Sequence, residues 1–281
     1  MQPCAALDNF TRIYSHFTYF MPSETVPRIS TPGAQSERTI VTKYYLRKYV
    51  HLGLPPDAAI LLDGRSGTYL GLNGHQAAAL RKVVHGWPEP ANDDSVLASA
   101  PDTPSVEPLL AQLVAAQLLT DDAAAGRIPG PLSLGEVVDS LVQWDATAKP
   151  AVRLHHVASL SFSCARAYCA LKWNSIGTTL QAVQTRKLSR VQSRDGVDWV
   201  KLRGMVRVFV ELRPWFYSHH DRCLFDSLVL IEFLAIYRIF PMWILGVKNA
   251  PFAAHSWVQQ GPYVLNGPPE SAREFTPIVI I

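Results

Sequence analysis

The chain has 281 residues, 48% of them hydrophobic and 17% charged, and its formal net charge is +3. This balance is typical of a folded globular protein and excludes the disordered, collagen-like and fibrous classes. Four cysteines are too few for a disulfide-stapled fold, and the longest apolar stretch, residues 228–247, contains charged residues and a proline. We therefore expect no metal or other cofactor and no membrane span. Because the first residues lack an uninterrupted apolar run, we expect a cytoplasmic location.

The charge is distributed unevenly along the chain. Residues 54–150 hold 12 acidic and 5 basic residues, whereas residues 151–281 hold 8 acidic and 15 basic ones. This difference favours two domains, although two solvated surfaces of drifted composition explain it equally well. The basic half has no lysine-rich tract and no nucleic-acid-binding motif, so we expect no nucleic-acid partner.

The N-terminal half has the pattern of a small mixed domain. Residues 1–40 are polar and contain prolines, which predicts a flexible segment. Hydrophobic alternation and helical spacing then predict strands at 44–52, 58–62 and 68–72, a helix capped by Asn73, and a second helix at 106–119. We interpret residues 41–125 as a small winged-helix-like domain.

The C-terminal half reads as helices followed by strands. Residues 126–150 predict a linker and a connecting helix, which Ser133 and Glu136 begin as a capping box and which continues through Val142. The later pattern predicts helices at 154–173, 178–192, 199–216 and 223–240, and strands at 242–247, 255–259 and 263–266. This order indicates an α+β domain, which we assign to residues 151–281.

Cys223 stands at a position where a thiol becomes reactive. Asp221 is a good N-cap for the apolar run that follows, so Cys223 falls in the first turn of the predicted helix. Unpaired backbone N–H groups and the positive end of the helix dipole favour a thiolate there. Position alone leaves the alternative open that Cys223 is an inert core residue.

His255 is the second candidate, because it begins a predicted strand that follows the cysteine helix. Imidazole on such a strand can reach a thiol at a helix N-terminus and act as general base and acid. Trp257 shares a strand face with His255, where it either shields the ring from water or serves ordinary sheet packing. Considered by itself, His255 could instead be a histidine with a purely structural role.

Several separated runs resemble one protein family in order and spacing: Asp221–Leu228, Gly246–Lys248, Pro251–Val258, Val264–Asn266 and Phe275–Ile278. They look like the C-terminal domain of bacterial lasso-peptide maturation B proteins of the microcin-processing type. The resemblance covers about residues 200 to 281. It implies a transglutaminase-like, papain-like cysteine peptidase in which Cys223 and His255 are the catalytic pair.

The N-terminal strands also resemble the leader-recognition domain that is fused to many of these enzymes. The resemblance implies that Tyr45, Leu61, Tyr69 and Leu70 bind the leader of a ribosomal precursor peptide, which adds as a strand to an exposed sheet edge. It further implies a partner, the ATP-dependent, asparagine-synthetase-like lasso cyclase. The chain itself has no phosphate-binding loop.

The chain departs from this family at the third catalytic residue, an aspartate, where it has Gly267. If Gly261 centres the hairpin turn, residue 255 faces residue 267, so an aspartate would hold the imidazole there and glycine cannot. Asn266 points to the opposite face unless the register slips by one residue. Glu270 and Gln259 could substitute only after local rearrangement. Asn266 and the Gly267 position are therefore our candidates for orienting or oxyanion contacts.

Three functional hypotheses remain open at this point. The first is an active leader peptidase with a weakened or replaced third residue. The second is a leader-binding scaffold whose peptidase is degenerate, and the third is an acyltransferase that uses the same Cys-His chemistry on another substrate.

Overall fold

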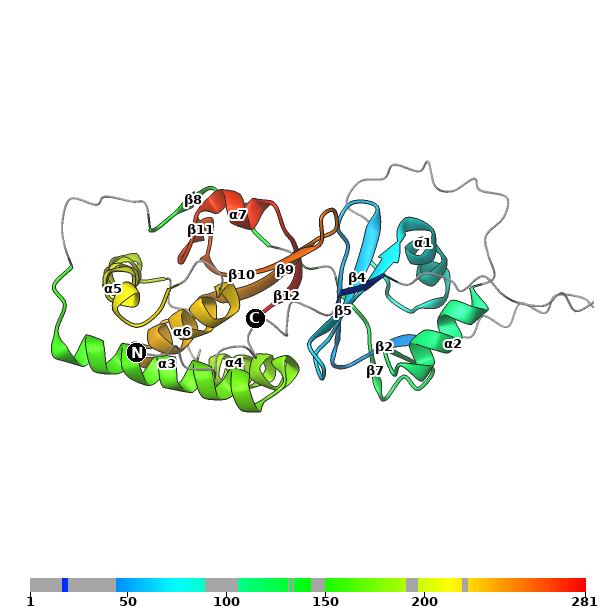
Figure 1. Ribbon diagram of the computed structural model, residues 1–281, viewed down its shortest axis with the longest axis horizontal. Helices are drawn as coiled ribbons and strands as arrows, with labels where there is room; N and C mark the ends of the chain where they lie inside the picture. Colours follow the sequence, from blue (N-terminus) through cyan, green and yellow to red (C-terminus); the bar gives the residue numbers. More distant parts are fainter. Residues whose placement is uncertain are drawn as a thin grey trace, which may run out of the picture.

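A computed structural model describes residues 44–88, 106–130, 132, 134–142, 150–190, 197–218 and 222–281, together with the backbone of residues 17–19. Figure 1 shows two parts side by side, the N-terminal one in blue to green and the C-terminal one in green to red. The fold mixes helices and strands, so the α+β expectation is confirmed. No helix among the described residues is long and apolar enough to cross a membrane.

The N-terminal part consists of short strands and two helices. Its elements are β2 (Tyr45–Arg47), β3 (Val50–Gly53), β4 (Ala58–Asp63), β5 (Thr68–Asn73), α1 (Gly74–Val83), α2 (Glu107–Ala115), β6 (Leu119–Thr120) and β7 (Gly126–Arg127). The single strand expected at 44–52 is split by a turn at 48–49, and β2 and β3 belong to different sheets. The Asn73 cap is confirmed, because its side chain accepts from the Gln76 N–H and Gln76 accepts from the Asn73 N–H.

β4 is buried on both faces, which explains why its sequence is continuously apolar. Ala59 and Leu61 pack into a core formed within the N-terminal part. Ile60 and Leu62, which alternate with them, pack into the large core of the C-terminal part. One strand therefore connects two hydrophobic cores, as expected when successive side chains point to opposite faces of a sheet.

The outer edge of β5 pairs with a short strand from the beginning of the chain. β1 (Phe17–Tyr19) runs parallel to β5, with residue 17 opposite residue 69 and residue 19 opposite residue 71. The sheet order is therefore β1-β5-β4-β3. Residues 1–16, 20–43 and 89–105, which include nearly all of the expected flexible segment, lie outside the described residues.

The C-terminal part places helices beside a five-stranded sheet. Its helices are α3 (Leu154–Trp173), α4 (Ile176–Arg190), α5 (Trp199–Leu212), the 3-10 turn η3 (Arg213–Trp215), α6 (Cys223–Ile236) and α7 (Pro269–Arg273), and its strands are β8 (Asp139–Ser140), β9 (Met242–Lys248), β10 (Ala253–Gln260), β11 (Tyr263–Val264) and β12 (Thr276–Ile280). The strand order is β12-β9-β10-β11-β8. α7 and β12 were not predicted from the sequence.

The predicted connecting helix through Val142 is wrong. Ser133 lies outside the described residues, but residues 134–142 contain no helix, and β8 runs parallel to β11. The backbone N–H groups of Val138 and Asp139 donate to the Pro262 carbonyl, and that of Leu141 donates to the Val264 carbonyl. Pairing with a distant strand thus outweighs the local capping signal, which is a weak preference by itself.

α6 forms the centre of the C-terminal core. Every residue from Leu224 to Ala235 is buried, so this helix is hydrophobic all round and can exist only inside the domain. The one charged residue in its second half, Glu232, accepts from Arg166 of α3 at 2.9 Å and from both terminal nitrogens of Arg186 of α4 at 2.7 Å. These bonds tie the three helices together around a buried carboxylate.

The two parts touch closely where β3 and the turn after β4 meet the C-terminal domain. The Gly177 N–H donates to the Gly64 carbonyl at 2.7 Å. A side chain at either glycine would collide with backbone, because a Cβ at Gly177 would lie 2.8 Å from the Gly64 oxygen. A methyl group at Gly53 would also press on Val247 at 3.1 Å. The seam therefore depends on residues without side chains.

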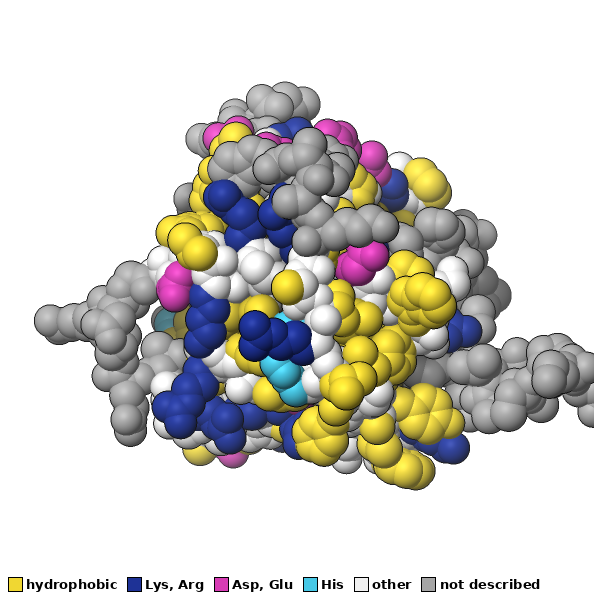
Figure 2. Space-filling model, turned by 90° about the vertical axis from the view of Figure 1, so that its left-hand side faces the viewer, with side chains coloured by type: hydrophobic (Ala, Val, Ile, Leu, Met, Phe, Trp, Pro, Cys, Tyr) yellow, Lys and Arg dark blue, Asp and Glu magenta, His cyan; other side chains and the backbone are white. Residues whose placement is uncertain are grey.

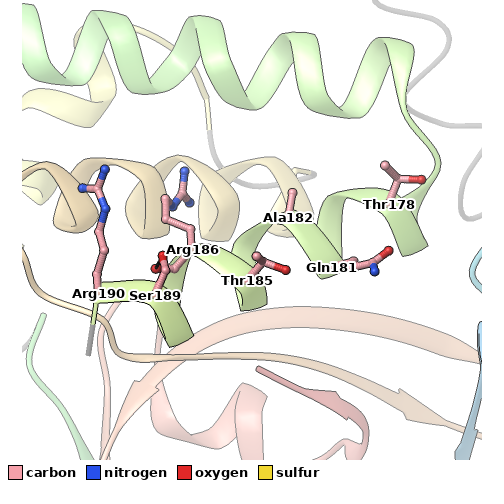
Figure 3. A pocket seen from close by; sticks show the side chains of 7 residues that line it. All are labelled: Thr178, Gln181, Ala182, Thr185, Arg186, Ser189 and Arg190. Atoms are coloured by element: carbon pink, nitrogen blue, oxygen red, sulfur yellow. Dashed lines mark hydrogen bonds between the residues drawn. The ribbon is translucent and has the colours of Figure 1, made fainter. Parts of the chain in front are cut away.

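The surface of the C-terminal part has two further features. A hollow of about 500 Å³ follows one side of α4 (Figure 3), and all seven lining residues belong to that helix, so it is an open groove and not an active-site cleft. Figure 2 shows the end of the molecule on the left of Figure 1, where hydrophobic side chains gather beside Lys and Arg. The most exposed large hydrophobic side chains among the described residues are Leu154, Val200 and Trp215.

Candidate active site

Cys223 is the first residue of α6, as the sequence predicted. The N-cap is Arg222, whose backbone is not helical (φ −133°, ψ 40°), and Asp221, the expected N-cap, lies outside the described residues. The Arg222 side chain makes no capping hydrogen bond. The N–H groups of a first helical turn can stabilise a thiolate or an oxyanion beside it.

A buried polar network fixes the first turn of α6. The carboxylate of Asp226 accepts from Arg213 at 3.2 Å through both oxygens, from the Tyr217 hydroxyl at 2.9 Å and from the Asn266 amide at 2.9 Å. Arg213 and Asp226 are 6% and 2% exposed. Burial and the Asp226 carboxylate raise the pKa of Tyr217, so its hydroxyl stays a donor. The start of α6 is thereby anchored to η3 and to the segment that follows β11.

Asn266 forms the link between this network and β10. Its side-chain oxygen accepts from the Val258 N–H at 2.9 Å, and its amide donates to Asp226 and, at 3.1 Å, to the Ser227 hydroxyl. Asn266 is 8% exposed. It therefore positions α6 against β10 and makes no contact with the imidazole.

The expected pairing of residue 255 with residue 267 is wrong by one position. Gln260 pairs with Tyr263 and Gln259 with Val264, so the turn contains only Gly261 and Pro262. Gly261 has φ +54°, which a two-residue hairpin turn requires and glycine adopts without strain. β11 ends at Val264 and pairs only with Gln259 and Gln260. The part of β10 that contains His255 is therefore not paired with β11.

The surroundings of Gly267 leave room for a side chain at the position where the family has an aspartate. A Cβ built at this position has nothing within 4 Å, while its carbonyl accepts from the Ser140 hydroxyl at 2.7 Å. Of the other candidates, Gln259 is committed to the Gly135 and Gly261 carbonyls, and Glu270 is exposed on α7. Neither holds His255.

His255 lies in an aromatic cluster. Its ring stacks on Trp257, with centroids 5.9 Å apart and planes 16° apart, and lies 5.2 Å from the Phe275 ring. Gly246, which pairs with His255 on β9, makes room for this cluster, because a Cβ there would lie 2.7 Å from the Trp257 ring. Burial lowers the pKa of His255, and the carboxylates of Asp226 and Glu274 partly oppose that effect.

α6 and β10 begin at the same end of the domain, next to the N-terminal sheet. Phe252, just before β10, contacts Tyr69 of β5 with ring centroids 5.5 Å apart. Burial raises the pKa of Tyr69, and an electrostatic interaction with Cys223 adds to this rise. Tyr69 therefore faces the starts of both elements, which carry Cys223 and His255.

His255 lies on the face of β10 opposite the core that contains α6. Ala254 and Val258 pack into the core that contains α6, whereas Trp257 belongs to a separate cluster on the other face of the sheet. His255 shares that other face. The structure thus places the starts of α6 and β10 at one end of the domain, with His255 on the sheet face that carries Trp257.

The expected leader-binding residues lie in different places. Leu61 is completely buried in the N-terminal core, and Tyr69 is 5% exposed at the seam between the two parts. Leu70 is half-buried on β5, and Tyr45 on β2 is half-buried with its ring against His85. Side chains of Tyr45 and Leu70 therefore reach the surface, and the other two support the sheet.

Sequence reasoning missed three residues of the site. Asp226 was recoverable, because it lies one helical turn after Cys223, whereas Arg213 and Glu274 come from distant segments with no recognisable motif. Cys164 and Cys169 are free thiols, and burial raises the pKa of Cys164 to about 11. Within the described ranges, no group of three His, Cys, Asp or Glu side chains is placed to hold a metal ion.

Residues 158–280 match the family model described as the transglutaminase-like superfamily. This region is a transglutaminase-like domain. The matched segment begins in α3, ends in β12 and includes Cys223 and His255. Such a domain indicates a fold of the cysteine peptidase or acyltransferase type. No curated protein and no solved structure matches the chain.

Proposed function

We propose that this protein is a lasso-peptide maturation enzyme, which binds the leader of a ribosomal precursor and cleaves it from the core peptide. The observation that carries the proposal is the common end of α6 and β10. Within the transglutaminase-like domain, Cys223 and His255 both begin their elements beside the N-terminal sheet. A peptide held by that sheet would have its cleavage junction close to the thiol.

The chemistry follows from the two side chains. The Cys223 sulfur attacks the carbonyl carbon at the junction, and the α6 N–H groups stabilise the resulting oxyanion. The C–N bond then breaks, and protonated His255 gives its proton to the departing amine of the core peptide. Water, deprotonated by His255, hydrolyses the remaining thioester and releases the leader with a free carboxylate.

The leader is captured at the edge of β5. That edge can hold a strand, since the chain's own β1 pairs with it through residues 69–71. Backbone pairing gives affinity, and half-buried side chains such as Leu70 give specificity. Because Tyr69 lies on this strand and faces Cys223, a leader on β5 is tethered next to the reactive centre, which raises the effective concentration of the junction.

The released core peptide passes to an ATP-dependent, asparagine-synthetase-like cyclase. A partner of this kind needs a surface on the peptidase. The end of the molecule in Figure 2, with exposed hydrophobic side chains beside positive ones, has the mixed character of a protein interface.

Mass spectrometry of the precursor peptide encoded by the neighbouring gene tests this function. We expect incubation with the protein to produce one cleavage at the leader-core junction, which Cys223→Ala abolishes. Cys169→Ala, which changes another half-buried thiol, is the matched control and should leave cleavage intact. Uncleaved peptide in the presence of the unmodified protein and cyclase would contradict the proposal.

A second candidate function is a leader-binding scaffold with a degenerate peptidase. Gly267 and the position of His255 on the far face of the sheet favour it. Gly267→Asp separates the two functions, because the open space at this position accepts a carboxylate. A protein that binds leader but cleaves only as the aspartate variant is a scaffold in its natural form. A product with a new amide bond, in place of two peptides, would instead show an acyltransferase.

A further inference from the structure

An imidazole, an ammonium and a carboxylate gather near the ring of Phe275. The His255 ring lies 5.2 Å from Phe275, and the Lys248 ammonium lies 5.1 Å from the centroid of the same ring. Glu274, the residue before Phe275, accepts from Lys248 at 2.9 Å. The ends of α7 and β9 therefore bring a carboxylate and a cation to the aromatic ring that the imidazole contacts.

The carboxylates of Asp226 and Glu274 both raise the pKa of His255. They differ in how many hydrogen bonds they already accept. Asp226 of α6 is buried, and both its oxygens are bound by Arg213, Tyr217 and Asn266. Glu274 has a side chain that is 60% exposed, and Lys248 binds it through one oxygen, Oε2. Among the described residues, Glu274 is thus the carboxylate with the freedom to follow the imidazole.

The proposed Cys-His chemistry needs an acceptor beside the imidazole, and glycine at position 267 does not provide one. An imidazole that exchanges a proton with a thiol through one nitrogen is oriented by an acceptor at its other nitrogen. Asn266, which precedes Gly267 in the chain, is committed to α6 and β10. The cluster around Phe275 supplies the alternative.

We propose that Glu274 is the positioning residue of His255 and stabilises its protonated form, in competition with Lys248. The inference rests on the proposed Cys-His function. Lys248 neutralises Glu274 while the imidazole is neutral, and the carboxylate turns to the imidazolium when His255 carries a proton. Phe275 and Trp257 exclude water from one side of the ring, which strengthens the attraction.

NMR titration of the His255 imidazole in the full chain tests the inference without any peptide substrate. The His255 signal is assigned by its loss in His255→Gln. We expect Glu274→Gln to lower the pKa of His255, because it removes a carboxylate that raises it. We expect Lys248→Met to raise the same pKa, because Glu274 then loses its competing cation. Glu270→Gln, which removes an exposed carboxylate from the same short helix, is the matched control and should leave it unchanged.

The opposite signs of the two variants separate a positioning role from a structural one. Glu274→Asp should restore part of the lost shift, and 0.5 M salt should weaken all of these shifts because the groups are partly exposed. The inference is overturned if Glu274→Gln moves the pKa no more than Glu270→Gln, or if Lys248→Met lowers it. Since no peptide is involved, failed cleavage with the expected titration would count against the proposed function alone.

Discussion

The two parts of the molecule use charged side chains in opposite ways. In the N-terminal part, Asp63 and Arg65 pair at 3.0 Å with the arginine 41% exposed. In the C-terminal part, Arg213 and Asp226 pair at 3.2 Å with side chains 7% and 3% exposed. The first pair lies in a hairpin turn, whereas the second fixes the start of the helix that carries Cys223. The C-terminal part thus uses a buried charge network to fix the start of a helix, whereas the strands of the N-terminal sheet are held by backbone pairing.

Breaking the buried pair gives the largest expected loss of stability. Arg213→Ala leaves the Asp226 carboxylate buried without its cation, and we expect the free energy of unfolding to fall by about 3–5 kcal/mol. Chemical denaturation of the full chain measures it. A loss below about 1 kcal/mol would mean that the network does not anchor the first turn of α6.

The buried His51 imidazole makes the stability of the N-terminal sheet depend on pH. Burial, with Arg127 nearby, lowers the pKa of His51 from 6.5 to about 4. Between these values the unfolded chain binds the proton and the folded chain does not, so the free energy of unfolding falls as the pH drops, by up to about 3 kcal/mol. The effect is absent above pH 6.5. His51→Gln should flatten most of this slope in urea titrations, leaving the contributions of His156 and His255, whose pKa values are also lowered by burial. An unchanged slope would contradict this assignment.

A methyl group at the seam tests whether the two parts are stabilised together. We expect Gly177→Ala to lower the free energy of unfolding by about 1–3 kcal/mol, because its Cβ would meet the Gly64 carbonyl oxygen at 2.8 Å. Gly204→Ala is the control, since that position in α5 has nothing within 4 Å and alanine favours a helix by about 0.5–1 kcal/mol. Equal effects of the two variants would show that the seam is not tightly packed.

The exposed pair gives the smallest expected effect. Arg65→Ala should change the free energy of unfolding by less than about 1 kcal/mol, because solvent screens the ion pair. The arginine also stacks on the Tyr49 ring at 4.1 Å, so Arg65→Met, which keeps a long side chain, helps to separate packing from charge. A loss comparable to that of Arg213→Ala would remove the contrast between the two parts.

The sequence predicted best those elements whose signals are local. α3 starts at Leu154 and ends at Trp173, as expected, and α6 starts at Cys223, because both follow from helical spacing and from a change of composition at their ends. The Asn73 cap is equally local. In contrast, β8 was predicted as a helix because its partner, β11, lies more than 120 residues later and leaves no trace in the nearby sequence.

The candidate site shows the same difference between local signals and contacts of distant segments. Cys223 and His255 carry a spacing and a context that can be read directly, whereas the surroundings of the imidazole depend on register and on contacts between distant segments. The hairpin register failed by one residue because a turn of two residues and a turn of three are both compatible with Gly261 and Pro262. Glu274 was missed because only the packing of Phe275 brings it near His255.

The rate of alkylation at each cysteine tests the central claim, that Cys223 and His255 form one reactive centre. Iodoacetamide labelling between pH 6 and 8, followed by peptide mapping, measures Cys223 against Cys164, whose pKa of about 11 makes it an internal standard for an inert thiol. We predict that Cys223 reacts at least about tenfold faster than Cys164 near pH 7 and that His255→Ala removes most of this advantage, while Trp257→Phe does not. Equal rates at the two cysteines, or a Cys223 rate that is unaffected by His255→Ala, would contradict the account.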